Sequence, residues 1–152
     1  MNFKMEKGIT IVALLITIIL MLILVGVGIS FGGDAIDKAN LEDIKTDMIS
    51  IKTRAKIVAE QYNFKDIDAL VGSAITDEEK AKLKLSEKTE GLEDDEYEIL
   101  KWSSQDLTGQ NLSVIEGDKY VVFYNLKDPN GCEVYYLEGY EGVYSLSDLQ
   151  NL

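Results

Sequence analysis

The side chains that most often carry acid–base, nucleophilic or metal chemistry are scarce in this 152-residue chain. Histidine is absent, which excludes zinc sites of the usual kind and His-based catalytic triads. Cys132 is the only cysteine, so it has no partner for an intrachain disulfide or a cysteine metal cluster. We expect Cys132 to be a structural thiol at the start of a strand. The composition therefore predicts a protein that is not an enzyme and has no cofactor.

One acidic run offers oxygen ligands. The stretch from Glu90 to Glu96 reads Glu-Gly-Leu-Glu-Asp-Asp-Glu, and carboxylates of this kind suit calcium. The run lacks the D-x-D-x-D-G spacing of a calcium-binding loop. We interpret it as a solvated loop and predict no metal site.

The charge is strongly negative and unevenly distributed. The net charge is −12 at pH 7, and because Lys4, Lys7 and Glu6 leave the first 33 residues at +1, residues 34–152 carry −13. Nucleic acids require Lys and Arg opposite their phosphates, and anionic lipids attract basic surfaces. We therefore expect no nucleic-acid contact from this chain and interpret the acidic surface as a solvating one.

An uncharged run dominates the N-terminal part. The 23 residues from Ile9 to Phe31 contain no Asp, Glu, Lys or Arg, and as a helix they would extend about 35 Å, enough to cross the hydrocarbon core of a bilayer. Only a helix satisfies the backbone of a single such span from within. Because Lys4 and Lys7 lie before the run, we predict a single-pass membrane protein with its N-terminus in the cytoplasm and the remainder outside.

The run by itself leaves several interpretations open. An ordinary N-terminal anchor explains any such helix. A secretory signal peptide is disfavoured because its apolar region is usually about 7–15 residues long and ends at a small-residue cleavage site. Here the run is longer, and its best small-residue site lies around Gly26 and Gly28.

The junction before the run is more specific. It reads Lys7-Gly8-Ile9-Thr10 and continues into an apolar helix that contains Leu14-Leu15. This pattern resembles the class III signal of type IV pilins and pseudopilins, especially the pilin-type proteins of low-GC Gram-positive bacteria. The resemblance implies that a prepilin peptidase cleaves between Gly8 and Ile9. Ile9 would then be the mature N-terminal residue and the site of N-methylation.

The sequence departs from this family at one position. Its members usually carry glutamate at the fifth mature residue, where the acid neutralises the N-terminal amine of a neighbouring subunit, and here that position is Ala13. An alanine has no charge to offer the amine. The departure predicts a minor rather than a major subunit.

The rest of the chain divides into a helix and a head. We expect a leader over 1–8, a membrane or filament-core helix over 9–33, an amphipathic half over 34–62 and a small α+β head over 63–152. Apolar residues at alternating intervals of three and four define the amphipathic half: Leu41, Ile44, Met48, Ile51, Ala55, Val58 and Tyr62. Glycines 26, 28, 32 and 33 predict an interruption or a bend, since each costs up to about 1 kcal/mol in a helix.

Within the head, Thr76 and Glu79 have capping-box spacing, which predicts a short helix from Asp77. Strands are expected over 97–102, 119–125, 132–137 and 143–146, with a turn of helix near 103–107. Six tyrosines after position 119 fit either a core or a surface that stacks on sugars or partners. The fold class is α+β, with the long helix packed on a small antiparallel sheet in the manner of pilins.

Two functions follow from these observations. The first is a pilin-like structural subunit of a type IV pilus or a secretion pseudopilus. Its partners would be a prepilin peptidase, other pilin subunits contacted through the N-terminal helix, and membrane lipid before assembly. The alternative is a singly anchored cell-surface binding protein that does not polymerise. Cleavage after Gly8 distinguishes them, because a simple anchor does not need that cut.

Overall fold

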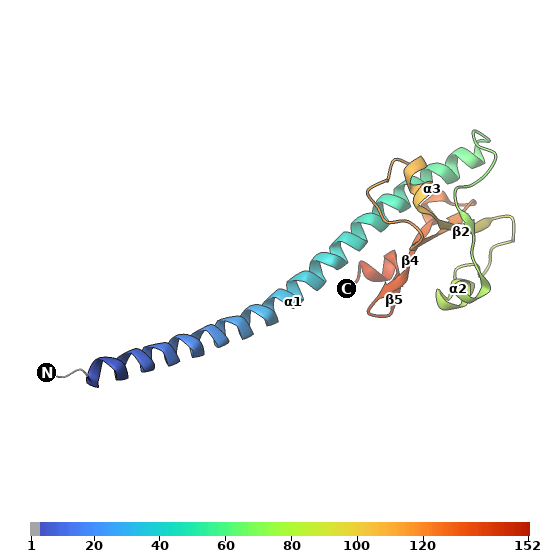
Figure 1. Ribbon diagram of the computed structural model, residues 1–152. Coiled ribbons are helices and arrows are strands. Elements are labelled where there is room, and N and C mark those ends of the chain that lie inside the picture. The colour runs from blue at the N-terminus through green and yellow to red at the C-terminus, as the bar shows by residue number, and fades with distance from the viewer. Residues whose placement is uncertain (1–3) are drawn as a thin grey trace. The chain divides into compact units, whose positions relative to one another are not determined.

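A computed structural model describes the backbone of residues 4–152 and the side chains of residues 11–23 and 37–152. The chain divides into two compact units, Met1–Asn40 and Leu41–Leu152. Helix α1, Lys4–Asn63, contributes residues to both units (Figure 1). It is continuous, so the interruption expected at glycines 26 to 33 is wrong. Glycine weakens a helix without preventing it from adopting helical backbone angles.

The second unit is an α+β domain built on one antiparallel sheet. Five strands follow each other in chain order across the sheet: β1 Ser73–Ala74, β2 Tyr97–Trp102, β3 Tyr120–Asn125, β4 Glu133–Tyr140 and β5 Val143–Ser145. The central pair is the longest, since β2 and β3 are in register from Tyr97↔Asn125 to Trp102↔Tyr120. The strands expected over 119–125 and 132–137 pair as β3 and β4 in an antiparallel hairpin, and its connection contains the short 3-10 helix η2, Pro129–Gly131.

One face of the sheet is covered by the part of α1 that begins at Leu41, as Figure 1 shows. The predicted apolar face is confirmed: Met48, Ile51, Ala55 and Val58 are fully or almost fully buried, together with Ala59. They pack in one core with alternate residues of the central strands, which a pleated strand directs to the same side. On β3 these residues are Tyr120, Val122 and Tyr124.

The opposite face of the sheet has its own core. Val121 and Phe123 of β3 point to this side and pack with Tyr135 of β4. The covering layer is the connector between α1 and β2, which contains helix α2, Asp77–Lys82, and the 3-10 helix η1, Leu85–Glu87. Ile75, Leu83 and Leu85 of this connector are buried. This connector is therefore also a layer of the core.

Side-chain caps begin the short helices. Thr76 and Glu79 form the predicted capping box of α2, and Ser103 and Asp106 form another at α3, Ser104–Gly109. These caps satisfy backbone N–H groups that have no partner within the helix. At the C-terminus, Ser145 caps α4, Leu146–Leu149. The expected final strand therefore ends one residue earlier, and a helix that the sequence analysis missed follows it.

Polar contacts also hold the second half of α1 on the head. Lys52 Nζ lies 3.2 Å from Glu133 Oε1 of β4, and the Asn63 side-chain amide donates a hydrogen bond to the Leu126 carbonyl at 2.8 Å. Glu133 is only 2% exposed. It also accepts hydrogen bonds from its neighbouring backbone N–H at Val134 and from the Ser147 hydroxyl of α4. A buried carboxylate with three donors joins α1, β4 and α4.

Candidate functional site

The described part of α1 before residue 24 is apolar and exposed. Its eleven large aliphatic side chains are between 47 and 71% exposed: Ile11, Val12, Leu14, Leu15, Ile16, Ile18, Ile19, Leu20, Met21, Leu22 and Ile23. A contiguous apolar surface of this kind usually marks a site of contact with protein or membrane. Thr17, the one polar side chain in the stretch, donates a hydrogen bond back to the Ala13 carbonyl at 2.7 Å.

Among the described residues, no helix is both long enough and apolar enough to cross a membrane. The span expected over 9–33 extends on both sides of the stretch 11–23. Its remaining residues lie outside the side chains that the structure describes.

The residues of the junction have different places in the structure. Gly8 and Ile9, the expected cleavage and methylation positions, belong to the helical backbone of α1, but their side chains lie outside the described ones. Ala13 is described and exposed, on the same turns as the apolar side chains. A residue in this environment can contact a neighbouring molecule directly.

Two other candidate groups lie elsewhere. Cys132 is buried just before β4, and burial raises the pKa of its thiol, which makes the reactive thiolate scarce. The acidic run from Glu90 to Glu96 forms the turn that leads into β2. No group of three Asp, Glu, Cys or His side chains that could hold a metal ion occurs among the described residues.

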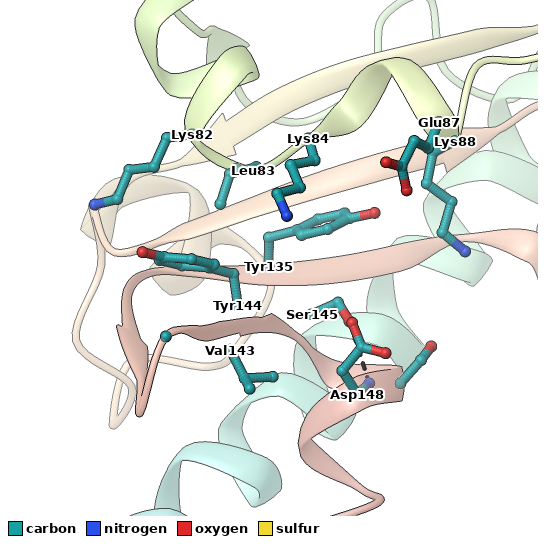
Figure 2. Close-up of a pocket in the computed structure, with 12 residues that line it drawn as sticks. Lys82, Leu83, Lys84, Glu87, Lys88, Tyr135, Val143, Tyr144, Ser145 and Asp148 are labelled. Carbon is teal, nitrogen blue, oxygen red and sulfur yellow. Dashed lines mark hydrogen bonds between the residues drawn. The ribbon is translucent and has the colours of Figure 1, made fainter.

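A pocket of about 520 Å³ opens on the connector side of the sheet (Figure 2). Its lower wall comes from β4, β5 and α4, and its upper wall comes from the ends of α2 and η1 and the residues that flank them: Lys82, Leu83, Lys84, Glu87 and Lys88. Lys84 has a left-handed backbone conformation, with a φ angle of 51°, and lies where α2 ends and η1 begins. This turn places lysines on both sides of it along one wall.

Tyr135 forms the floor of the pocket. Its side chain is 4% exposed, and its hydroxyl forms no hydrogen bond with any residue that the structure describes. In Figure 2 the Lys84 side chain lies above the ring, and the hydroxyl points toward the end of the pocket that holds Glu87 and Lys88. Burial raises the pKa of the phenol, and the nearby carboxylates of Glu133 and Asp148 raise it further. The hydroxyl is therefore a proton donor throughout the physiological pH range.

Tyr144 is the second tyrosine of the pocket. Lys82 Nζ lies 5.5 Å from the centre of its ring and donates a hydrogen bond to the Leu137 carbonyl at 2.7 Å. Gly139 allows this arrangement, because a Cβ there would lie 2.6 Å from a carbon of the Tyr144 ring. The Tyr144 ring thus packs closely against the Gly139 backbone and lies near the Lys82 ammonium group.

Most of the tyrosines considered for a stacking surface belong to the core. Tyr120, Tyr124, Tyr135 and Tyr136 are buried, and the Tyr124 hydroxyl accepts a hydrogen bond from the Trp102 indole at 2.8 Å. The core interpretation is therefore correct for these four. Among them, Tyr135 lines the pocket through an edge that still reaches open space.

No family model, curated protein or solved structure matches this chain.

The pocket lysines were missed at the level of sequence. A signal was present, because the stretch from Lys80 to Lys88 contains four lysines and one glutamate in an otherwise acidic chain. Charge runs are common on solvated helices, so this signal becomes informative only when the run is seen to line a pocket.

Proposed function

We propose that this protein is a pilin-like structural subunit that assembles through its N-terminal helix. The observation that carries the proposal is the exposed apolar surface of α1 between Ile11 and Ile23. A surface of this kind requires an apolar environment. The junction Lys7-Gly8-Ile9 supports the same function, because it has the form of a prepilin cleavage signal at the start of that helix.

In this mechanism the helix resides in the membrane before assembly, with the N-terminus in the cytoplasm and the head outside. Prepilin peptidase removes the eight-residue leader, and the helix then moves from lipid to the helices of neighbouring subunits. The acidic head stays in water and forms the outer surface of the filament. Polymerisation in a type IV pilus or secretion pseudopilus would follow from contacts between helices.

Processing provides the direct test. Co-expression with a prepilin peptidase should shorten the chain by eight residues and leave Ile9 at the N-terminus, which mass spectrometry of the intact protein would show. Gly8→Ala should be processed better than Gly8→Leu, because the peptidase requires a small residue at the cut. Recovery of the surface protein with Met1 still attached would rule out the proposal.

The position of Ala13 refines the proposal to a minor subunit. In an apolar filament core a free amine is costly unless a carboxylate faces it. Ala13→Glu should therefore increase incorporation along a filament built with partner subunits, whereas Ala13→Gln, which has similar size but no charge, should not. Immunogold counting along purified filaments would measure the difference. Long filaments made mainly of the unmodified chain would contradict the minor role.

The singly anchored binding protein remains a second candidate, and the lysine-lined pocket of the head favours it. The two functions differ in processing and in association. A simple anchor retains its first eight residues and remains a monomer in detergent, whereas a pilin-like subunit loses them and crosslinks to other subunits through its helix.

A further inference from the structure

We infer that the pocket between α2–η1 and β4–β5 binds a small anionic ligand through a phosphate or a carboxylate group. The inference concerns the head alone and is independent of how the N-terminal helix assembles. Its starting point is the unpartnered hydroxyl of Tyr135, which lies on the floor of the pocket. The residue is almost wholly buried, but its hydroxyl is not among the buried polar atoms and reaches the open space of the pocket, so the O–H is available to a ligand.

The hydrogen-bond donors around the pocket indicate that the ligand is negatively charged. The ammonium groups of Lys84 and Lys88 form no ion pair and no hydrogen bond with the described residues, although both side chains line the pocket. Most other described lysines of the head do have such partners; Lys101, for example, lies 3.2 Å from Glu79 Oε1. With the Tyr135 hydroxyl, which can donate as well as accept, these two ammonium groups make three groups that can donate hydrogen bonds to a ligand. Three donors facing one space suit an oxyanion.

Two carboxylates also line the pocket, and they limit its affinity for an anion. Asp148 is already engaged, because it accepts a hydrogen bond from the Ser145 hydroxyl at 2.6 Å within the cap of α4. Glu87 lies beside Lys88 on the upper wall (Figure 2). With Lys82, the lining still has one positive charge in excess, in a chain whose net charge is −12. The pocket is thus a local exception to an acidic surface.

The test uses the full-length chain, kept in solution by a nonionic detergent because of its exposed apolar helix. Thermal unfolding of the head is followed by the fluorescence of Trp102, the only tryptophan, while inorganic phosphate, citrate or chloride is added at matched ionic strength. A ligand that binds only the folded head raises its melting temperature by mass action. The inference predicts a saturable rise with phosphate or citrate and none with chloride. The comparison of phosphate with citrate identifies which oxyanion the pocket prefers.

Variants separate binding from the general stabilising effect of such salts on folded proteins. Lys84→Met combined with Lys88→Met should abolish the saturable rise. Lys80→Met is the matched control, because Lys80 lies in α2, four residues before Lys84, lines no part of this pocket and interacts with Asp77. An equal rise in the unmodified chain and the double variant would overturn the inference.

Two further variants, at Tyr135 and Glu87, test whether these side chains affect anion binding rather than the stability of the head. Tyr135→Phe should leave the melting temperature without ligand unchanged, because the hydroxyl has no partner to lose, yet weaken anion binding measured by calorimetry about tenfold. Glu87→Gln should tighten the same binding by removing a repulsive charge. If the Tyr135→Phe variant binds phosphate and citrate with the same affinity as the unmodified chain, the Tyr135 hydroxyl does not contact the ligand.

Discussion

Two parts of α1 show how differently one helix can use apolar residues. Between Ile11 and Ile23 almost every side chain is apolar, and the large ones are at least 47% exposed. Between Leu41 and Asn63 polar side chains are interspersed with apolar ones, and the apolar side chains that face the sheet are buried. The more hydrophobic part is therefore the more exposed one.

The difference lies in what each part can contact within its own chain. A narrow apolar face needs only one partner surface, and the sheet of the head provides it. A helix that is apolar all around needs an apolar environment on every side, which a head covering one face cannot supply. The comparison thus distinguishes residues that stabilise the domain from residues that stay exposed.

The largest expected difference in stability is between an isoleucine-to-alanine substitution in the buried part of α1 and the same substitution in the exposed part. Ile51→Ala should reduce the free energy of unfolding of the head by about 2–5 kcal/mol, because it leaves a cavity between α1 and the sheet. Ile19→Ala should change it by less than about 0.5 kcal/mol. Urea denaturation followed by Trp102 fluorescence would measure both. Equal losses would mean that the exposed stretch belongs to the core of the head.

A second effect concerns the buried ion pair that holds α1 on the sheet. Lys52→Met should cost about 1–3 kcal/mol, because the nearly fully buried Glu133 loses its cation. Adding Glu133→Gln to Lys52→Met should recover part of that loss, since the amide carries no charge. A double-mutant cycle in urea would show the coupling. Purely additive losses would show that Lys52 contributes only through packing.

A smaller difference in stability is expected between removing a threonine hydroxyl at the start of a helix and removing one in a helix interior. Thr76→Ala should cost about 1 kcal/mol, because the Thr76 hydroxyl accepts the Glu79 backbone N–H at the start of α2. Thr17→Ala should cost less than about 0.5 kcal/mol, because Thr17 only donates to a carbonyl within α1. Thermal unfolding of the two variants is the measurement. A larger loss for Thr17→Ala would show that its hydroxyl has a structural role.

The smallest effect depends on pH. Burial raises the pKa of Asp47 above its ordinary value of 3.8, a hydrogen bond from Tyr120 opposes this, and the charges of Asp43 and Glu116 add to it. A carboxyl group with a raised folded-state pKa contributes stability that is complete below its unfolded pKa and is lost as the pH rises through the folded one.

Asp47→Asn does not titrate, so its melting temperature should exceed that of the unmodified chain by a margin that grows from about pH 3 to about pH 7. Glu42→Gln is a suitable control, because Glu42 lies on the solvent side of the same helix. A margin that shrinks as the pH rises would mean that the Tyr120 hydrogen bond outweighs burial.

Much of the fold could be predicted from local patterns. Local residue patterns predict the apolar face from Leu41 to Val58, the capping box of Thr76 and Glu79, and the strands β2, β3 and β4. Each depends on residues a few positions apart, whose preferences act within one helical turn or one strand. β1, only two residues long, and α4, only four, were missed. Elements this short have too few residues to form a period, and pairing or packing with the rest of the domain stabilises them.

The candidate sites also divide into those that depend on neighbouring residues and those that depend on the tertiary structure. The junction at Gly8, the uncharged run after it and the alanine at position 13 are properties of consecutive residues, so the sequence by itself determined the proposed processing and the exposed apolar helix. The pocket required the tertiary structure, because Tyr135 meets Lys84 and Lys88 only after a sheet register and a left-handed turn bring distant segments together. Lys52 and Glu133 are likewise 81 positions apart. No local preference specifies such contacts, since they depend on how every element between them packs.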